Sequence, residues 1–186
     1  DELKIGDPEN SIESWQRQLE YLSWKLEEQE TEYPQLVVTC NALWGVDKTE
    51  FQQALNSLTY FIQSLFDCEP VFVLQTYVDS VNKDRMILRA KDLMSWMKEI
   101  YLWDNTIFLL NLSDVPEWIQ YGNHYAVFGL TGNPIEPILE AYKNIWDHAA
   151  TLGLPLGAGY WSSNYMTQRS RDTMECLLLQ YDWYHY

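Results

Sequence analysis

The side chains that usually bind metals or act as nucleophiles are few and scattered along the 186 residues. The cysteines Cys40, Cys68 and Cys176 are an odd number, and no two have the CxxC spacing of a zinc or redox site. None of the three histidines stands in an HExxH or triad-like pattern. We therefore expect no metal and no cofactor, and the cysteines predict reduced, mostly buried thiols in a cytoplasmic protein.

Glu175 is the carboxylate with the most unusual neighbours, because it stands in an apolar run near the C-terminus. In a strand it would share one face with Leu177 and Leu179. Burying an unpaired carboxylate beside leucines is costly and would raise its pKa. A bound organic cation would remove that cost, which makes Glu175 a candidate ligand contact. The alternatives are an ion pair with Arg169 or Arg171, or a place at the solvent edge.

Nine tryptophans and thirteen tyrosines are a heavy aromatic load that can fill a core, line a pocket or build an interface. Tyr142 and Trp146 are four residues apart on one helix face, so they either wall a pocket or fill the core. Trp44 closes the first expected strand, whereas Tyr160 and Trp161 open a later one. Strand ends near a groove suit an aromatic cage, in which each ring face contributes about 0.5–2 kcal/mol to cation binding.

The net charge is −15, from 12 basic and 27 acidic residues. Such a surface repels phosphate backbones and anionic lipid heads, which argues against direct nucleic-acid binding and membrane docking. No apolar run approaches the roughly 18 residues that a membrane span needs. The expected partners are a small lipophilic cation or a basic protein. The simpler alternative is that the acidity only maintains solubility.

The first half predicts three helices and three strands. A helix over 11–32, capped by Ser11, carries an apolar stripe of Trp15, Leu19, Leu22 and Leu26. It either packs on the domain or acts as a linker or dimerisation helix, so a homodimer is an open expectation. A helix over 48–66 follows a capping-box pattern that begins at Asp47. The other segments are a helix over 84–102 and strands over 36–43, 71–78 and 106–112.

The second half has similar parts: a strand over 125–130, a helix ending at Gly153, and strands over 160–165 and 174–181. We therefore expect an α+β fold of two strand–helix–strand–strand repeats, over 35–113 and 123–182, related by a pseudo-twofold, with the helix over 84–102 as an insertion in the first repeat. Helices would pack on a mostly antiparallel sheet, and residues 1–34 would form a tail and helix before the domain of residues 35–186. A doubly wound parallel sheet competes, since strands and helices alternate through residue 112. The lack of a Gly-rich loop and of a helix between the last strands argues against it.

Several short motifs follow one another in the second half of the chain. They are VPE at 115–117, YAVF at 125–128, Gly132, LEAYKNIW at 139–146, Tyr165, and MECLL at 174–178. Their order and spacing from 115 to 181 resemble the second repeat of the gyrase-inhibitor-like (GyrI-like) effector-binding domains. In the first half only the topology is similar. These domains occur as drug-sensing halves of transcription regulators and as stand-alone proteins.

The resemblance implies a pocket between two repeats that binds amphipathic, often cationic compounds. Glu175 would be the counter-charge, and Tyr165 would offer its hydroxyl to the ligand. One branch of the family is hydrolytic and uses a pocket carboxylate. This chain reads SSNY at 162–165 where the family usually has aromatic–Glu–x–Tyr, so one acidic position is missing.

Three functions follow from these observations. The first is the binding of amphipathic, cationic small molecules in an aromatic-lined groove with Glu175 as counter-charge. The second is an acidic inhibitor or immunity protein that masks a basic protein. The third is a hydrolase of the same family, which is disfavoured because no second catalytic group is evident.

Overall fold

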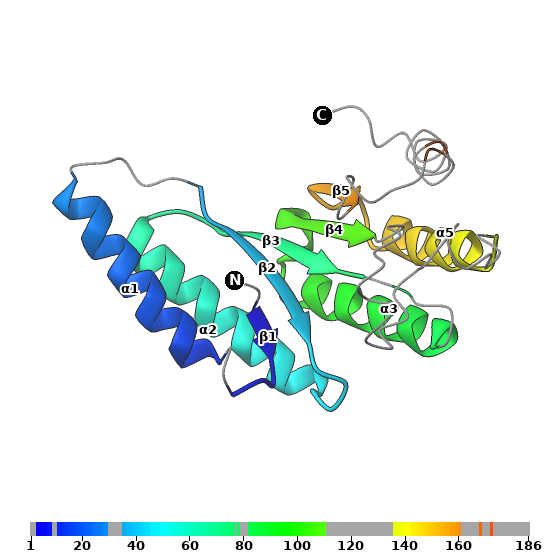
Figure 1. The fold of residues 1–186 in the computed structure, drawn as a ribbon, viewed down its shortest axis with the longest axis horizontal. Helices are drawn as coiled ribbons and strands as arrows, with labels where there is room; N and C mark the ends of the chain where they lie inside the picture. The colour runs from blue at the N-terminus through cyan, green and yellow to red at the C-terminus, as the bar shows by residue number, and fades with distance from the viewer. Residues whose placement is uncertain are drawn as a thin grey trace. The chain divides into compact units, whose positions relative to one another are not determined.

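The computed structural model describes residues 3–8, 11–29, 35–76, 78, 82–110, 136–160, 168 and 172. Strands and helices alternate along these residues (Figure 1). The order is β1 (Leu3–Ile5), α1 (Ile12–Glu28), β2 (Val37–Ala42), α2 (Lys48–Phe66), β3 (Val71–Gln75), α3 (Lys83–Glu99), the 3-10 helix η1 (Trp103–Asn105), β4 (Thr106–Leu110), α5 (Glu136–Thr151) and β5 (Gly157–Tyr160).

Side-chain caps begin the first two helices, as their sequences predict. The backbone N–H of Ser14 donates to the Ser11 hydroxyl at 3.3 Å, and that of Glu50 donates to the Asp47 carboxylate at 2.9 Å. The helix predicted over 48–66 is confirmed at both ends. Its buried face is Phe51, Leu55, Leu58, Ile62 and Phe66.

The prediction of a mostly antiparallel α+β sheet is wrong. β2 pairs in parallel with both β1 and β3, and β4 pairs in parallel with β5. The five strands form one sheet in the order β1-β2-β3-β4-β5. Parallel neighbours need a long crossover, and a helix lies between each pair of consecutive strands. α3 is therefore a crossover helix and not an insertion into a repeat.

The parallel sheet of the competing doubly wound arrangement is confirmed, but the order of the described strands runs from β1 to β5 without the reversal of a doubly wound sheet. β5 ends at Tyr160, where the sequence predicts a strand over 160–165 to begin. The strands predicted over 125–130 and 174–181 lie outside the described residues. Among the described helices, none is long and apolar enough to cross a bilayer.

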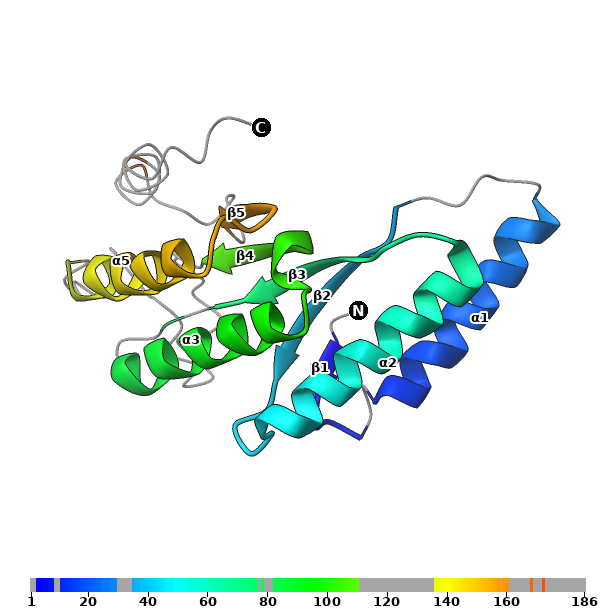
Figure 2. The ribbon, with the colours of Figure 1, turned by 180° about the vertical axis from the view of Figure 1, so that it is seen from behind.

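The chain divides into two compact units, of which the first comprises Asp1–Leu74 and Trp96–Thr106. In this unit α1 packs along α2, as Figures 1 and 2 both show. One face of the strands is fully buried through Leu3, Cys40, Phe72 and Leu74. The turn after β1 requires Gly6, whose φ is 89° and whose Cα lies close to Val46.

The second unit comprises Gln75–Ser95 and Ile107–Tyr186. Thr76, just beyond β3, donates to the carbonyl of Leu109 in β4 from both its backbone N–H and its hydroxyl, at 3.0 and 2.8 Å. Phe108 of β4 meets Trp146 of α5 edge to face, with ring centroids 5.7 Å apart. Aromatic packing between β4 and α5 thus forms the core of this unit.

Candidate functional site

An apolar groove of about 650 Å³ lies in the first unit, between α1 and the beginning of β2. Pockets that enclose drug-sized ligands have volumes of about 300–1,000 Å³. The aromatic and aliphatic side chains that line the groove are Trp15, Leu19, Tyr21, Leu22, Leu36, Val37 and Val38. Its size and lining make it the described cavity best suited to an apolar ligand.

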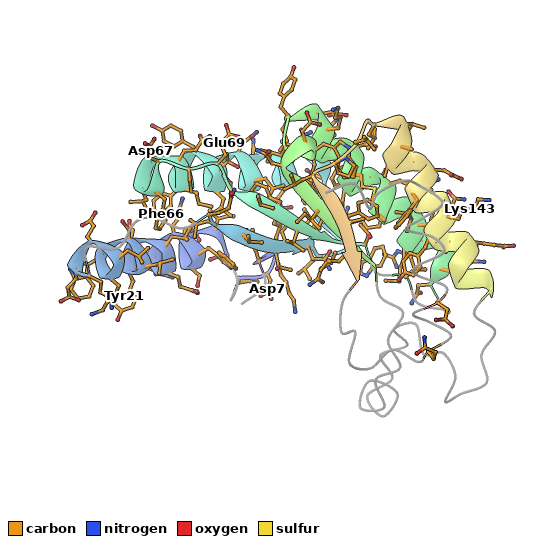
Figure 3. All side chains as sticks on the ribbon, turned by 90° about the horizontal axis from the view of Figure 1, so that it is seen from above. Asp7, Tyr21, Phe66, Asp67, Glu69 and Lys143 are labelled. Atoms are coloured by element: carbon orange, nitrogen blue, oxygen red, sulfur yellow. The ribbon has the colours of Figure 1, made fainter. Side chains whose placement is uncertain are left out.

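The groove exists because α1 packs on α2 without closing over the start of β2. Leu19 and Ser23 are the buried side chains of α1. Leu22 belongs to the predicted apolar stripe but is exposed, and 61% of Tyr21 and 59% of Val37 are also exposed. Figure 3 shows Tyr21 on the side of α1 that faces away from α2. Neighbouring exposed apolar side chains of this size are typical of a binding surface.

Polar groups in the groove are few. Arg17 is the charged residue of the lining, beside Ser14 and Gln18. The indole N–H of Trp15 is buried and has no hydrogen-bond partner among the described residues. A buried donor without a partner is unfavourable, so a ligand acceptor at this nitrogen would relieve a cost. The groove therefore offers apolar contact with one or two polar anchors.

Aromatic rings beside the groove already hold a cation. The Lys25 ammonium lies 4.3 Å from the centre of the Trp24 ring and 5.9 Å from that of Tyr21. The two rings are 5.7 Å apart, and Lys25 also pairs with Glu28 at 2.8 Å. Ring faces at this end of α1 are thus exposed and can bind a positive group.

A second hollow, of about 390 Å³, lies at the carboxyl end of β1 in the same unit. Its charged lining residues are Asp7, Glu13 and Glu50, and no basic side chain lines it. Glu13 and Glu50 stand in the first turns of α1 and α2, where helix dipoles stabilise negative charge. Stabilisation by the helix dipoles therefore explains why these two carboxylates occur at this place, without a bound ligand. No cluster of potential metal ligands occurs within the described residues.

Of the seven residues predicted to bind ligand, Trp44, Tyr142 and Trp146 have described side chains, and none of these three lines either hollow. Tyr142 and Trp146 are fully buried, and the Tyr142 hydroxyl accepts from the backbone N–H of Val78 at 3.3 Å. Trp44 is half exposed in the turn after β2. Tyr160 is the last residue of β5. Trp161, Tyr165 and Glu175 lie outside the described residues, so their roles stay predictions.

The structure also pairs two reactive side chains that the sequence did not single out. The Ser95 hydroxyl on α3 lies 2.9 Å from Nε2 of His148 on α5, and both residues are half-buried. They are 53 residues apart in sequence, and neither stands in a catalytic motif. The packing of α3 against α5 creates the pair, so no local sequence signal could have revealed it.

The groove, by contrast, could be predicted in part from the sequence. Tyr21 and Trp24 lie outside the apolar stripe of α1, and the apolar run LVV at 36–38 spans the start of β2. Large rings outside the buried stripe of a helix indicate a second apolar surface.

Comparison of the chain with protein-family models, with curated proteins and with solved structures found no match.

Proposed function

We propose that the protein binds amphipathic small molecules, with a preference for cations, in the groove between α1 and β2. The groove itself is the observation that supports this proposal, because it combines drug-sized volume with exposed apolar lining. Trp15 and Tyr21 provide ring surface on α1, and Val37 provides aliphatic surface on β2.

Apolar burial would supply most of the affinity. Each 100 Å² of apolar surface removed from water contributes about 2.5 kcal/mol before the costs of association are subtracted. The Trp15 indole N–H would orient a ligand that carries an acceptor. Ligands with a large apolar body and few polar atoms fit this lining best.

The preference for cations rests on the field of the whole chain. A net charge of −15 concentrates small cations near the surface and repels anions. The groove lining itself holds Arg17 and no carboxylate. The positive group of the ligand would therefore stay at the solvent rim, near exposed carboxylates of α1 such as Glu20. Glu175 remains the predicted counter-charge of a separate site.

Tetraphenylphosphonium and tetraphenylborate test this proposal, because the two ions share one shape and differ in sign. Titrating each against tryptophan fluorescence should show the cation binding at least tenfold more tightly. Leu22→Gln should weaken cation binding about five- to tenfold, which corresponds to about 1–1.4 kcal/mol of lost apolar contact. Equal binding of the two ions would refute the preference for cations.

Leu88→Gln is the matched control, because Leu88 is an exposed leucine on α3 that lines neither hollow. It should leave affinity unchanged. Glu175→Gln separates the two locations: a loss of affinity in this variant with none in Leu22→Gln would transfer the function to the predicted site. Absence of binding by a panel of lipophilic cations would overturn the function altogether.

A second function, an acidic protein that masks a basic partner, is favoured by rings outside the groove. Tyr60 on α2 and Tyr101 after α3 are highly exposed, and neither lines a hollow. Exposed tyrosines on an acidic surface are suited to a protein interface. Capture of a basic partner that weakens steeply with added salt would support this function over the first.

We propose a cytoplasmic location for either function. Cys40 and Cys68, the cysteines among the described residues, form no disulfide. Labelling of the Cys68 thiol in intact cells, without prior reduction, tests the location: a membrane-permeant reagent should label it, and labelling by an impermeant reagent would contradict it.

A further inference from the structure

The contact between Ser95 and His148 has the geometry of a nucleophile and its base. The distance of 2.9 Å from the Ser95 hydroxyl to His148 Nε2 is a full hydrogen bond. Ser95 lies inside α3, and His148 lies in the last turn of α5. Both belong to the second unit, and both residues are half-buried and so not sealed inside the core.

The surroundings of His148 keep its imidazole neutral. Desolvation is the main cause that lowers its pKa below the ordinary 6.5, and the positive charge of Lys91 adds to this effect. A hydrogen bond with the Lys91 backbone and the charge of Asp92 act in the opposite direction but do not prevail. At neutral pH the ring can therefore accept a proton, which a general base must do.

Lys91 stands one helical turn before Ser95 on the same face of α3. The backbone N–H of Ser95 is part of the helix, so a developing negative charge at the substrate needs a side-chain partner. The Lys91 ammonium is the cation on this face that the electrostatics of His148 place nearby. A cation near the pair would stabilise the negative charge that develops on the substrate in acyl transfer.

We propose that Ser95 and His148 form a nucleophile–base pair that accepts an acyl group from activated carboxylic esters. This activity is independent of ligand binding in the groove between α1 and β2, because none of the three residues lines it. The pair has both a nucleophile and a base, whereas the sequence alone showed no second catalytic group beside Glu175. The substrate class is small esters with a good leaving group.

The reaction balances without any co-reactant other than water. The Ser95 oxygen bonds to the acyl carbon while its proton passes to His148 Nε2, and the ester bond then breaks to release the leaving-group oxygen with the bonding electron pair. A phenolate departs as the anion, and the imidazolium proton passes to solvent. Water then attacks the acyl-serine while His148 takes its proton. As the bond between the acyl carbon and the Ser95 oxygen breaks, the imidazolium returns this proton to the Ser95 oxygen, which yields the carboxylic acid and free Ser95.

p-Nitrophenyl acetate, with peptide mapping by mass spectrometry, tests the proposal on the unmodified chain. We expect acetylation of the peptide that contains Ser95, at a rate that follows the neutral imidazole and is half-maximal below pH 6.5. Lysine and tyrosine side chains react faster only as pH rises into the alkaline range, so the pH profile separates them from Ser95. Acetylation confined to lysines would overturn the proposal without any variant.

Variants then assign the roles. Ser95→Ala should abolish this modification, and His148→Gln should slow it at least about tenfold. Lys91→Met should slow it several-fold and move the half-maximal pH upward, because a repelling charge is removed from the ring. Ser64→Ala is the matched control, since the Ser64 hydroxyl also lies in a helix but donates to the Phe61 carbonyl. An unchanged rate in His148→Gln would mean that the contact only ties α3 to α5.

Discussion

Tyr101 lies just after the end of α3, in a conformation that glycine adopts more easily. Its φ is 63°, in the left-handed region, and 90% of its side chain is exposed. Around it the backbone N–H of Tyr101 donates to the Lys98 carbonyl at 3.1 Å, and that of Leu102 donates to the Met97 carbonyl at 3.0 Å. This is the hydrogen-bond pattern of a helix C-terminus that usually carries glycine. Tyr101→Gly should therefore increase stability.

The expected size follows from two opposing effects. The left-handed conformation costs a side-chain-bearing residue about 1–2 kcal/mol, and glycine avoids this cost. Glycine also gains freedom in the unfolded chain, which lowers stability by about 0.5–1 kcal/mol. The exposed ring buries too little surface to add a third effect. The free energy of unfolding should rise by about 0.5–1 kcal/mol.

Urea unfolding followed by tryptophan fluorescence measures this change as a higher midpoint at constant slope. Tyr60→Gly is the matched control, because Tyr60 is also exposed but lies inside α2. There the same substitution should lower stability by about 0.5 kcal/mol. If Tyr101→Gly is also destabilising, the reasoning about the helix end is wrong, and the Tyr101 ring must form contacts of its own.

Three other changes test separate parts of the fold. Asp47→Ala removes the acceptor for the Glu50 backbone N–H and should lower the free energy of unfolding by about 1 kcal/mol in the same urea assay. Trp146→Ala should lower it by about 3–5 kcal/mol, because the fully buried ring leaves a cavity beside Phe108; a loss below 1 kcal/mol would show that the ring is not core. The folded state lowers the pKa of His148, so the unfolded chain binds the proton first as pH falls through 6.5, and stability should decrease from that point downward. Thermal unfolding between pH 7.5 and 5 should show a flatter decrease for His148→Gln, and identical slopes would contradict the assigned burial.

The helices were predictable because the signals that define them, a capping residue and apolar residues at helical spacing, are local in the sequence. Asp47 followed by Glu50, with an apolar residue every three or four positions, defines α2 without any knowledge of its partners. The run VFVL at 71–74 was equally informative, since four consecutive buried residues are typical of a parallel strand covered on both faces. This signal, with the strand–helix alternation through residue 112, favoured a parallel sheet.

The predicted fold class is wrong because the elements expected in the second half, whose last two strands have no helix between them, indicate an antiparallel repeat. A strand–helix–strand–strand repeat has no place for the helix over 84–102, which in the structure is the crossover between β3 and β4. The missing Gly-rich loop after β2 argues against a phosphate site but not against a parallel sheet. The groove and the pair of Ser95 and His148 depend on how separate helices pack, which local periodicity does not encode.

We propose that lipophilic cations bind in the groove between α1 and β2. The most direct test is the affinity of tetraphenylphosphonium for the unmodified protein and for Leu22→Gln, with tetraphenylborate as the ion of opposite sign. We predict saturable binding of the cation, at least tenfold weaker binding of the anion, and a five- to tenfold loss in the variant. Binding that ignores both the sign of the ion and the change at Leu22 would contradict the account.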